Sequence, residues 1–351
     1  MKQLAVVGAG AIGLAVAWWA AAAGWVVTVY DPEPARGASW VAGGMLAASS
    51  EGWPGEEELL ALSALSLARW PEFAKRLVAE SGMPSGLRTD GMVIVGMDSA
   101  DAKELDVLAN WLAENGRPVA RLSGRELRRH EPALSQGIRA ALDVPDDLAV
   151  DNRALLAALQ AACAVSGVRV VRERVTDPAL LEADQVVISA GVGASALHAM
   201  ARVRAVKGEI LRVRSRAGVL PSPGRTVRGL VYGRRVYLVP RDDGLVVGAT
   251  QHEVGHDREV TIGGVRDLIA DAETVLPTIA EYELVSADAG LRPMSPDNLP
   301  LIGRVDARTV LATGHGRNGL LLAPITAEAV LAELDGRPLP EVAAAHPRRF
   351  A

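Results

Sequence analysis

Cysteine is nearly absent from the sequence, with Cys163 the single one among 351 residues. One thiol excludes an internal disulfide and cannot supply the four thiolates of a zinc or iron–sulfur site. Aromatic residues are also scarce, at 4%, and no segment places them among clustered Lys and Arg. Because the formal net charge is −5, we expect neither a nucleic acid nor an anionic membrane as a partner, but a small-molecule ligand and a reducing, cytoplasmic location.

Long hydrophobic runs are missing as well. No segment reaches the roughly 20 apolar residues that a membrane-spanning helix needs, so no membrane span is expected. The apolar stretch that follows Lys2 and ends at residues 20–23 has the outline of a secretory leader. It is interrupted by Gly8, Gly10 and Gly13 at a meaningful spacing, so we expect it to be part of the folded protein.

What the sequence does contain is an alternation of strand and helix patterns. Leu4–Val7 and Val26–Tyr30 are short apolar runs typical of buried strands, and Ala11–Ala23 between them is typical of a buried helix. At least four strand-like runs broken by Pro and Gly lie between Val203 and Gly248, which predicts an antiparallel sheet in a second domain. Further helices are predicted over residues 56–81, 99–115, 123–130, 151–167, 261–276 and 319–334, and further strands over 91–96, 168–171, 185–189 and 309–312.

Three glycines connect the first predicted strand to the first predicted helix. Gly8 permits a tight turn, Gly10 lets the backbone approach a pyrophosphate, and Gly13 lets the helix pack close to the strand. The N-terminus of that helix adds positive potential for the phosphates. Asp31 ends the next strand, 21 residues after Gly10, where its carboxylate can accept hydrogen bonds from a ribose. These residues predict a dinucleotide site without choosing between NAD and FAD.

Two further segments decide between these cofactors. Arg36–Met45 is a run of small residues where an NAD enzyme would usually continue its sheet, and Gly314-His-Gly-Arg-Asn-Gly319 precedes the last predicted helix. In this order they resemble the D-amino-acid oxidase family of flavoenzymes, and within it the glycine oxidases of thiamine biosynthesis. The resemblance covers nearly the whole chain and includes Val206–Glu209, Val236–Pro240, Val246–Thr250, Ala289–Pro293 and Leu301–Gly303. It implies non-covalently bound FAD, since no cysteine after Cys163 could attach a flavin.

The resemblance also assigns the cofactor site. Small residues after Asp31 would wrap the flavin, and His315–Leu321 would approach the isoalloxazine ring. A helix N-terminus near Asn318–Gly319 would stabilise the negative charge that reduced flavin carries around N1 and its C2 carbonyl. The residues expected to contact FAD are Gly8, Gly10, Ala11, Ile12, Gly13, Asp31, Pro32, Ala38, Ser39, Gly43, Gly44, Met45, Val175, His315, Gly316, Arg317, Asn318, Gly319, Leu320 and Leu321.

Three residues are the catalytic candidates. An amino-acid oxidase must hold its substrate by the carboxylate, and a guanidinium does so with two parallel hydrogen bonds. Arg292, in the apolar segment Ala289–Pro293, is the candidate for this contact, with a buried structural ion pair as the alternative. Tyr237, on a predicted strand, would bond the same carboxylate or line the cavity, with a plain core position as the alternative. Arg317 would add a second contact to substrate or flavin.

The function that the resemblance implies is oxidation of glycine, and of sarcosine or small D-amino acids, to the 2-oxo acid, ammonia and hydrogen peroxide. Hydride transfer from the substrate Cα to flavin N5 needs no acid–base residue once the amine is deprotonated. Oxygen would be the second substrate, and the tetramers of relatives predict a homotetramer. Two alternatives stay open: a D-amino-acid, sarcosine or proline oxidase or dehydrogenase of other specificity, and a non-catalytic flavin-binding module.

The implied fold combines α/β and α+β classes, with a Rossmann-like FAD-binding domain and a second domain built on an antiparallel sheet. The FAD-binding domain is expected to be discontinuous, and the substrate-binding domain to be inserted into it. The expected segments are 1–85, 140–202 and 289–351 for the FAD-binding domain, and 86–139 and 203–288 for the substrate-binding domain.

The sequence departs from its relatives at three places. Only Thr176–Asp184 stands where relatives usually carry several strands, which predicts a trimmed connection. Arg235 stands where some glycine oxidases have histidine, and Gln251 where some have methionine. Because these positions belong to the expected pocket wall, the substrate is less firmly predicted than the cofactor.

The segment His252-Glu-Val-Gly-His256 spells a zinc-protease motif. That motif places both imidazoles on one face of a helix, whereas this segment directly follows the predicted strand Leu245–Gly248 and contains Gly255. It also has no obvious third ligand at a familiar spacing. We therefore expect a solvated loop here, and no metal site.

Overall fold

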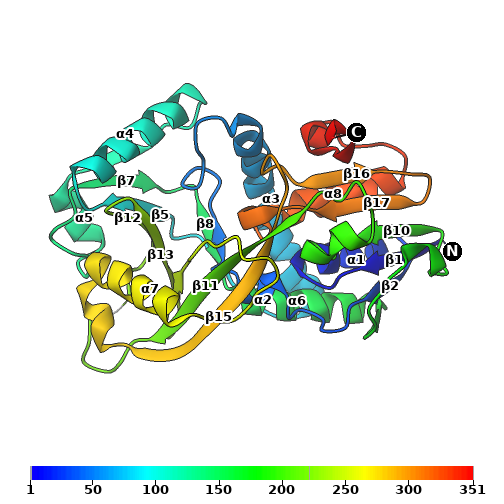
Figure 1. Ribbon diagram of the computed structural model, residues 1–351, viewed down its shortest axis with the longest axis horizontal. Coiled ribbons are helices and arrows are strands. Elements are labelled where there is room, and N and C mark those ends of the chain that lie inside the picture. Colours follow the sequence, from blue (N-terminus) through cyan, green and yellow to red (C-terminus); the bar gives the residue numbers. More distant parts are fainter. Residues whose placement is uncertain (1, 221, 351) are drawn as a thin grey trace.

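Two β-sheets lie side by side in the protein, and the chain passes between them several times (Figure 1). This architecture comes from a computed structural model, which describes residues 2–220 and 222–350. A six-stranded sheet forms the half that contains both chain ends, and an eight-stranded sheet forms the other half. The fold class predicted from the sequence is therefore confirmed.

The six-stranded sheet is built from apolar runs buried on both faces, as expected for parallel strands covered by helices. All neighbours pair in parallel except at one edge, where the first two strands are antiparallel. From edge to edge the strands are β16 (Leu301–Arg304), β17 (Thr309–Thr313), β10 (Gln185–Ile188), β1 (Gln3–Val7), β2 (Val26–Tyr30) and β9 (Arg169–Val171). The predicted opening of strand, helix and strand is confirmed.

Four helices form the core of this half together with the six-stranded sheet: α1 (Ala11–Ala22), α3 (Glu57–Ser81), α6 (Asn152–Val165) and α8 (Ala323–Leu334). α1 contacts both α6 and α8, and α3 contacts the same two helices. Trp18 and Trp70 each pack edge-on against Phe73 in this core. The apolar residues of α8 face all round, as predicted, because nine of its residues are buried.

The eight-stranded sheet is antiparallel apart from one parallel pair, between its fifth and sixth strands. From edge to edge the strands are β15 (Glu283–Met294), β11 (Arg204–Arg214), β14 (Gly244–Gly248), β13 (Arg234–Arg241), β12 (Thr226–Val231), β5 (Met92–Gly96), β7 (Ala140–Val144) and β6 (Ala120–Leu122). α7 (Ile262–Val275) packs on one face through Leu268 and Val275, and α4 (Ser99–Glu114) packs on the other through Leu105 and Leu108.

Local sequence signals account for the ends of several helices. Asp98 caps α4, Asp151 caps α6 and Thr261 caps α7 by accepting backbone N–H bonds. The predicted capping box is present at α5 (Gly124–His130), where Ser123 and Glu126 bond each other's backbone. The short connection after β9 contains only one turn of 3₁₀-helix, η1 (Pro178–Leu180), as the trimmed connection predicts.

The last helix begins later than predicted. Residues 316–318 form a 3₁₀ turn, η4 (Gly316–Asn318), and four further turn residues precede α8 at Ala323. Pro324 sits in the first turn of α8, where its missing N–H has no cost, and this sets the start of the regular helix. A helix N-terminus near Asn318–Gly319 is therefore wrong in detail, although the backbone of Gly319 is already in the helical region.

Several strands were not predicted from the sequence. Two of them, β7 and β15, bear on the borders between the two domains. A small third sheet contains β3 (Met45–Leu46), β8 (Leu148–Val150) and β4 (Leu87–Arg88). β7, and the part of β15 from Ala289 onwards, pair in the eight-stranded sheet although both lie in segments expected to bind FAD. We therefore propose the same two domains, but with the second and third FAD-binding segments beginning after Val144 and after Met294.

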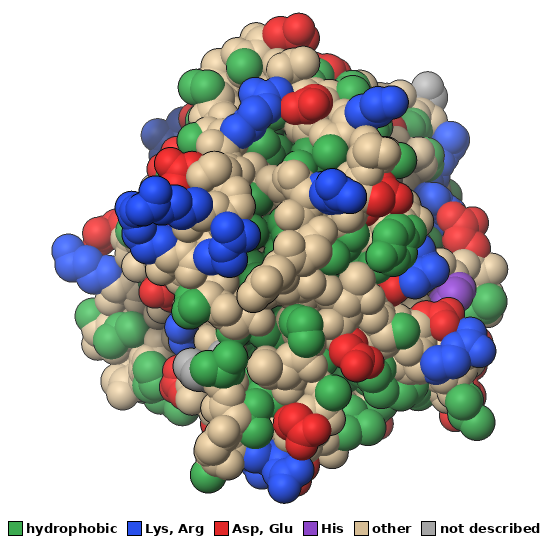
Figure 2. All heavy atoms as spheres, turned by 90° about the vertical axis from the view of Figure 1, so that its left-hand side faces the viewer, with side chains coloured by type: hydrophobic (Ala, Val, Ile, Leu, Met, Phe, Trp, Pro, Cys, Tyr) green, Lys and Arg blue, Asp and Glu red, His purple; other side chains and the backbone are tan. Residues whose placement is uncertain are grey.

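The surface of the eight-stranded half carries mixed charges. Figure 2 shows basic and acidic side chains interspersed with hydrophobic ones on this face. The segment 252–256 is an exposed loop between β14 and α7, as predicted, and Gly255 has φ +65°. Among the described residues, none of the helices is both long and apolar enough to cross a bilayer.

Candidate active site

The carboxyl ends of the parallel strands meet at the edge of the six-stranded sheet that faces the rest of the molecule. Gly8 follows β1 with φ +108°, a conformation that side chains other than glycine rarely adopt. A Cβ on Gly13 would stand 2.5 Å from Ser189 Oγ, so only glycine lets α1 pack this closely on the loop after β10. Ligands of open α/β sheets bind at this kind of edge.

Asp31 and Ser39 approach the N-terminus of α1 from two sides. Asp31 follows β2 and accepts hydrogen bonds from Ala9 N (2.7 Å) and Glu33 N (2.8 Å), which leaves further lone pairs on its carboxylate. Ser39, on the short helix α2 (Ala38–Val41), accepts one from Ala11 N at 3.1 Å. Ile12 is half-buried on α1, Pro32 is exposed after Asp31, and Val175 packs in the hydrophobic cluster that contains Tyr30.

The glycine pair before β3 lies against the second sheet. Arg241 donates from Nη2 to the carbonyl of Gly43 at 2.9 Å, and Val150 N donates to the carbonyl of Gly44. Gly44 has φ +90°, and a Cβ on Gly43 would stand 2.5 Å from the ring of Tyr237. Gly43, Gly44 and Met45 are thus placed between the glycine loop of the first sheet and Tyr237 of the second.

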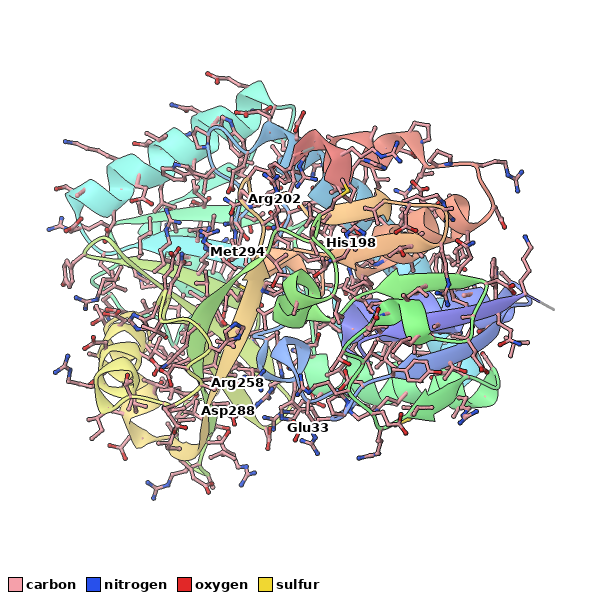
Figure 3. All side chains as sticks on the ribbon, turned by 45° about the vertical axis from the view of Figure 1, so that its right-hand side comes forward. Glu33, His198, Arg202, Arg258, Asp288 and Met294 are labelled. Atoms are coloured by element: carbon pink, nitrogen blue, oxygen red, sulfur yellow. The ribbon has the colours of Figure 1, made fainter. Side chains whose placement is uncertain are left out.

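The segment after β17 comes to the same place from the other end of the chain. His315 pairs with Met294, which Figure 3 labels on β15, so this segment is joined to the strand that carries Arg292. His315 is buried and its Nε2 lies 3.0 Å from Thr326 Oγ1, and burial lowers the pKa of its imidazole to about 3. Leu320 and Leu321 are buried in the core of the first half.

Arg292 and Tyr237 lie on the face of the eight-stranded sheet that is turned toward these segments. Arg292 donates from Nη1 to the carbonyls of Lys207 (3.3 Å) and Thr250 (3.2 Å) and pairs with no carboxylate among the described residues. Tyr237 is half-buried, and its ring lies against Gly43 and Gly248. Burial raises the pKa of Tyr237 to about 12, although the charge of Arg292 opposes this shift. The phenol is therefore protonated at every physiological pH.

Arg317 is engaged differently from the other two candidates. Its Nη2 lies 2.5 Å from a carboxylate oxygen of Glu56 and also donates to the carbonyl of Glu51 at 3.2 Å. Its Nε lies 3.8 Å from the Glu51 carboxylate. The guanidinium thus fixes the loop at 51–56 to the segment after β17. Because its guanidinium is engaged by these two acids, the arrangement does not favour a direct contact of Arg317 with the substrate.

Sequence reasoning missed three charged residues at this place, Asp147, Glu51 and Arg228. Asp147 is buried and accepts from Ser49 N (3.0 Å) and Ser50 N (2.7 Å), which holds the loop that carries Glu51. Burial raises the pKa of Asp147. Arg228, on β12, is directly opposite Tyr237. None of the three belongs to a motif. The alternation of inward and outward side chains along a strand could have pointed to Arg228 only if the pairing of β12 with β13 had been known.

Comparison with known proteins then identifies the family. The profile described as FAD dependent oxidoreductase (DAO) matches residues 3–334. The chain belongs to this family. The family, the class of enzyme and FAD as the cofactor, all predicted from the sequence, are thereby confirmed. Cys163 is buried and its Sγ contacts the carbonyl of Leu14 behind α1, so this FAD-dependent oxidoreductase has no thiol placed to attach a flavin covalently.

Named relatives and solved structures cover the whole fold. A glycine oxidase of Pseudomonas putida is 31% identical over 93% of this chain and 93% of its own length. A bifunctional protein ThiO/ThiG of Trichormus variabilis is 29% identical over 93% of this chain, which spans 51% of that longer protein. The crystal structure of glycine oxidase from Geobacillus kaustophilus superposes with a TM-score of 0.90, at 30% identity, over 99% of this chain and 98% of that one.

The residues at the strand ends fit FAD. The first turn of α1 has a glycine as its N-cap, and Ala11 N donates to Ser39 Oγ, which leaves the backbone N–H groups of Ile12 and Gly13 available to phosphate oxygens. Gly8, Gly10 and Gly13 keep that approach free of side chains, and Asp31 has acceptor capacity for a ribose. The isoalloxazine ring would then be held between the Gly43–Met45 segment and the His315–Gly319 segment.

Proposed function

We propose that the protein oxidises the amine of glycine, and of sarcosine or small D-amino acids, with FAD as the cofactor and oxygen as the second substrate. Glycine, oxygen and water would give glyoxylate, ammonia and hydrogen peroxide. The observation that carries this proposal is Arg292, a cation that has no carboxylate partner within residues 2–220 and 222–350 and is fixed beside Tyr237 and the expected flavin segments. The relatives named glycine oxidase support the same substrate.

Arg292 is arranged to bind a carboxylate with one edge of its guanidinium. Both hydrogen bonds that it makes to the residues described in the structure leave from Nη1, to carbonyls that hold the side chain in place. Nη2 and Nε therefore remain for two parallel hydrogen bonds to a substrate carboxylate. A carboxylate held in this way fixes the orientation of the neighbouring Cα–H bond.

Tyr237 would complete this carboxylate site. Because the pKa of Tyr237 is raised to about 12 by burial, its phenol remains a hydrogen-bond donor. The ring lies close against Gly43 and Gly248, which limits the positions that the hydroxyl can take. FAD, when bound, accepts the hydride from Cα. The protein's own task is to bind the amino acid as its neutral amine, to orient it and to exclude water from the site.

The test is a visible spectrum of the purified protein before and after glycine is added without air. A yellow protein that bleaches with glycine, and then releases peroxide when air is admitted, supports the proposal. Comparison of initial rates on glycine, sarcosine, D-alanine and D-proline orders the substrates. Rates that are highest on a bulky D-amino acid and negligible on glycine would show a D-amino-acid oxidase instead, and a yellow protein that no amine bleaches would show a non-catalytic module.

A place in thiamine thiazole synthesis is part of the proposal, because relatives are named ThiO/ThiG and thiamine biosynthesis oxidoreductase ThiO. Growth of a bacterial strain that lacks glycine oxidase, on medium without thiamine, should be restored by the gene for this chain. A homotetramer remains a prediction from the resemblance, and a cytoplasmic location remains a prediction from the single cysteine. Light scattering of the holoenzyme would measure its oligomeric state directly.

A further inference from the structure

Arg228 lies directly beside Tyr237 on the same face of the eight-stranded sheet. The pairing of β12 with β13 puts Arg228 opposite Tyr237, and the pairing with β5 puts Ile94 opposite Arg228 on the other side. Residues directly opposite one another on neighbouring strands project to the same face, with Cβ atoms roughly 4.5–5.5 Å apart. Continuing across the sheet, this is also the face of Arg292.

Arg228 differs from the other arginines of this face because it has no hydrogen-bond acceptor in the described part of the chain. Arg241 pairs with Asp151, Arg235 pairs with Glu104, Arg212 donates to Asn152, and Arg292 donates to two backbone carbonyls. Arg228 makes neither a hydrogen bond nor an ion pair with any residue that the structure describes. Burial lowers the pKa of Arg228, and Glu51, the acid whose charge acts on it most, lies beyond ion-pair distance.

Arg228 lines a small hollow between the sheet and α4. Helix α4 packs beside β5 and β7 at this end of the sheet (Figure 1). The walls are mostly apolar and include Leu105, Leu108 and Trp53. At its rim, Arg235 stacks on the Trp53 ring at 5.3 Å and donates to Glu104 at 2.9 Å. The rim charges thus neutralise each other, and Arg228 is left as the uncompensated charge of the hollow.

We infer that Arg228 binds a second anionic group of the substrate, so that the site accepts an α-amine with a further carboxylate on its side chain or on its nitrogen. A partly buried cation is stabilised by an anion, and apolar walls strengthen that interaction. This inference rests on the proposed function, because Arg292 would hold the α-carboxylate while Arg228 holds the distal one. Tyr237 is on β13, which lies between the strands that carry the two arginines, and it would contact the middle of such a substrate.

The test compares dicarboxylic amines with glycine on the holoenzyme. Flavin reduction is followed without air for glycine, sarcosine, N-(carboxymethyl)glycine, D-aspartate, D-glutamate and D-2-aminoadipate, a series that varies the distance between the two carboxylates. At least one dicarboxylic amine should have a kcat/KM about tenfold or more above that of glycine. Arg228→Met should lower the ratio of that kcat/KM to the glycine value by roughly 10- to 100-fold, as expected for a charge-assisted contact.

Arg121→Met is the matched control, since Arg121 is an exposed arginine that pairs with Asp106 far out on β6 and α4. It removes the same charge from the molecule and should leave the ratio within about twofold. If Arg228→Met also leaves the ratio within about twofold, or if none of the dicarboxylic amines exceeds glycine, the inference is wrong. Flavin content and melting temperature of both variants show whether they are folded.

Binding of dicarboxylates that have no amine to oxidise tests this inference separately from the proposed function. Malonate, succinate and glutarate are titrated into the wild-type holoenzyme with acetate as the reference, and the flavin spectrum and heat of binding are recorded. One of the dicarboxylates should bind at least tenfold more tightly than acetate, and Arg228→Met should abolish the difference. If no amine bleaches the flavin but this preference is present, the proposed function fails and the anion site stands. Glycine turnover without the preference overturns the inference alone.

Discussion

Arg292 lies directly over Gly208, so close that a Cβ on Gly208 would stand 2.5 Å from the guanidinium carbon. The two residues are on neighbouring strands, β15 and β11, and Gly208 pairs with Gly290 rather than with Arg292 itself. The long side chain thus folds back across its neighbour, which is possible only because residue 208 has no side chain. The position of the carboxylate-binding group is therefore determined by a glycine on another strand.

Gly208→Ala should displace Arg292 without removing its charge. We expect KM for glycine to rise about tenfold or more, with flavin content unchanged, because the guanidinium must move away from the carbonyls that hold it. Steady-state kinetics and the visible spectrum measure the two effects. Gly263→Ala is the matched control, since a Cβ there meets open space, and it should leave KM unchanged. Normal KM in both variants would show that the position of Arg292 does not matter for binding.

Arg292→Ala should remove the contact to the substrate carboxylate altogether. We expect kcat/KM for glycine to fall by about 100-fold or more, mainly through KM, because two charge-assisted hydrogen bonds are lost. The variant should remain yellow, since none of the contacts of Arg292 holds the segments expected to bind FAD. Colourless protein would instead place this side chain in cofactor binding or in folding, and Arg292→Lys, which keeps the charge without the fork, should fall between the two.

A buried network behind Arg292 offers an independent test of how this residue is positioned. Glu209 accepts from Thr261 N at 2.7 Å and from Thr250 Oγ1 at 3.0 Å, and the carbonyl of Thr250 is one of the two that hold Arg292. Burial raises the pKa of Glu209, but the hydrogen bonds from Thr261 and Thr250 outweigh it, so the net shift is downward. Lys207 lies 3.7 Å away on the same strand.

Glu209→Ala should therefore raise KM more than it changes kcat, and lower the melting temperature, because Thr250 loses its acceptor. A loss of stability of about 1–3 kcal/mol is expected when buried donors lose a charged partner. Glu253→Ala is the control: Glu253 is an exposed acid in the same loop region that pairs with Arg204. Equal effects of the two substitutions on KM would contradict a positioning role for the network.

The elements that could be predicted from the sequence are those whose conformation depends on residues within the element itself. The turn at Gly8 needs a positive φ, which is a property of that residue alone, and the capping box of Ser123 and Glu126 acts within four residues. What could not be predicted depends on long-range pairing. Arg317 pairs with Glu51 and Glu56, which lie about 260 positions away in the chain, and neither acid belongs to a motif. Arg228 becomes part of the site only through the pairing of β12 with β13.

Cys163 should be unreactive in the folded protein. It is buried beside α1, and burial raises the pKa of its thiol to about 12, so almost no thiolate is present at neutral pH. A disulfide reagent at pH 8 should modify less than about one tenth of the protein in an hour, and all of it after denaturation. Rapid modification of the native protein would show that the contact of α6 with α1 opens readily.

His315 should make the protein less stable in acid. Burial lowers its pKa from about 6.5 to about 3, so between these values the unfolded chain binds a proton that the folded chain does not. Stability from this group is complete above about pH 6.5 and falls by up to about 1.4 kcal/mol per unit as the pH drops toward 3. His315→Asn keeps a polar group near Thr326 Oγ1 and cannot be protonated. Urea unfolding at pH 4, 5, 6 and 7 should therefore show a smaller loss of stability for this variant than for the wild type. His130→Asn, at an exposed histidine, should follow the wild-type curve, and equal slopes in all three proteins would mean that His315 is not kept neutral by burial.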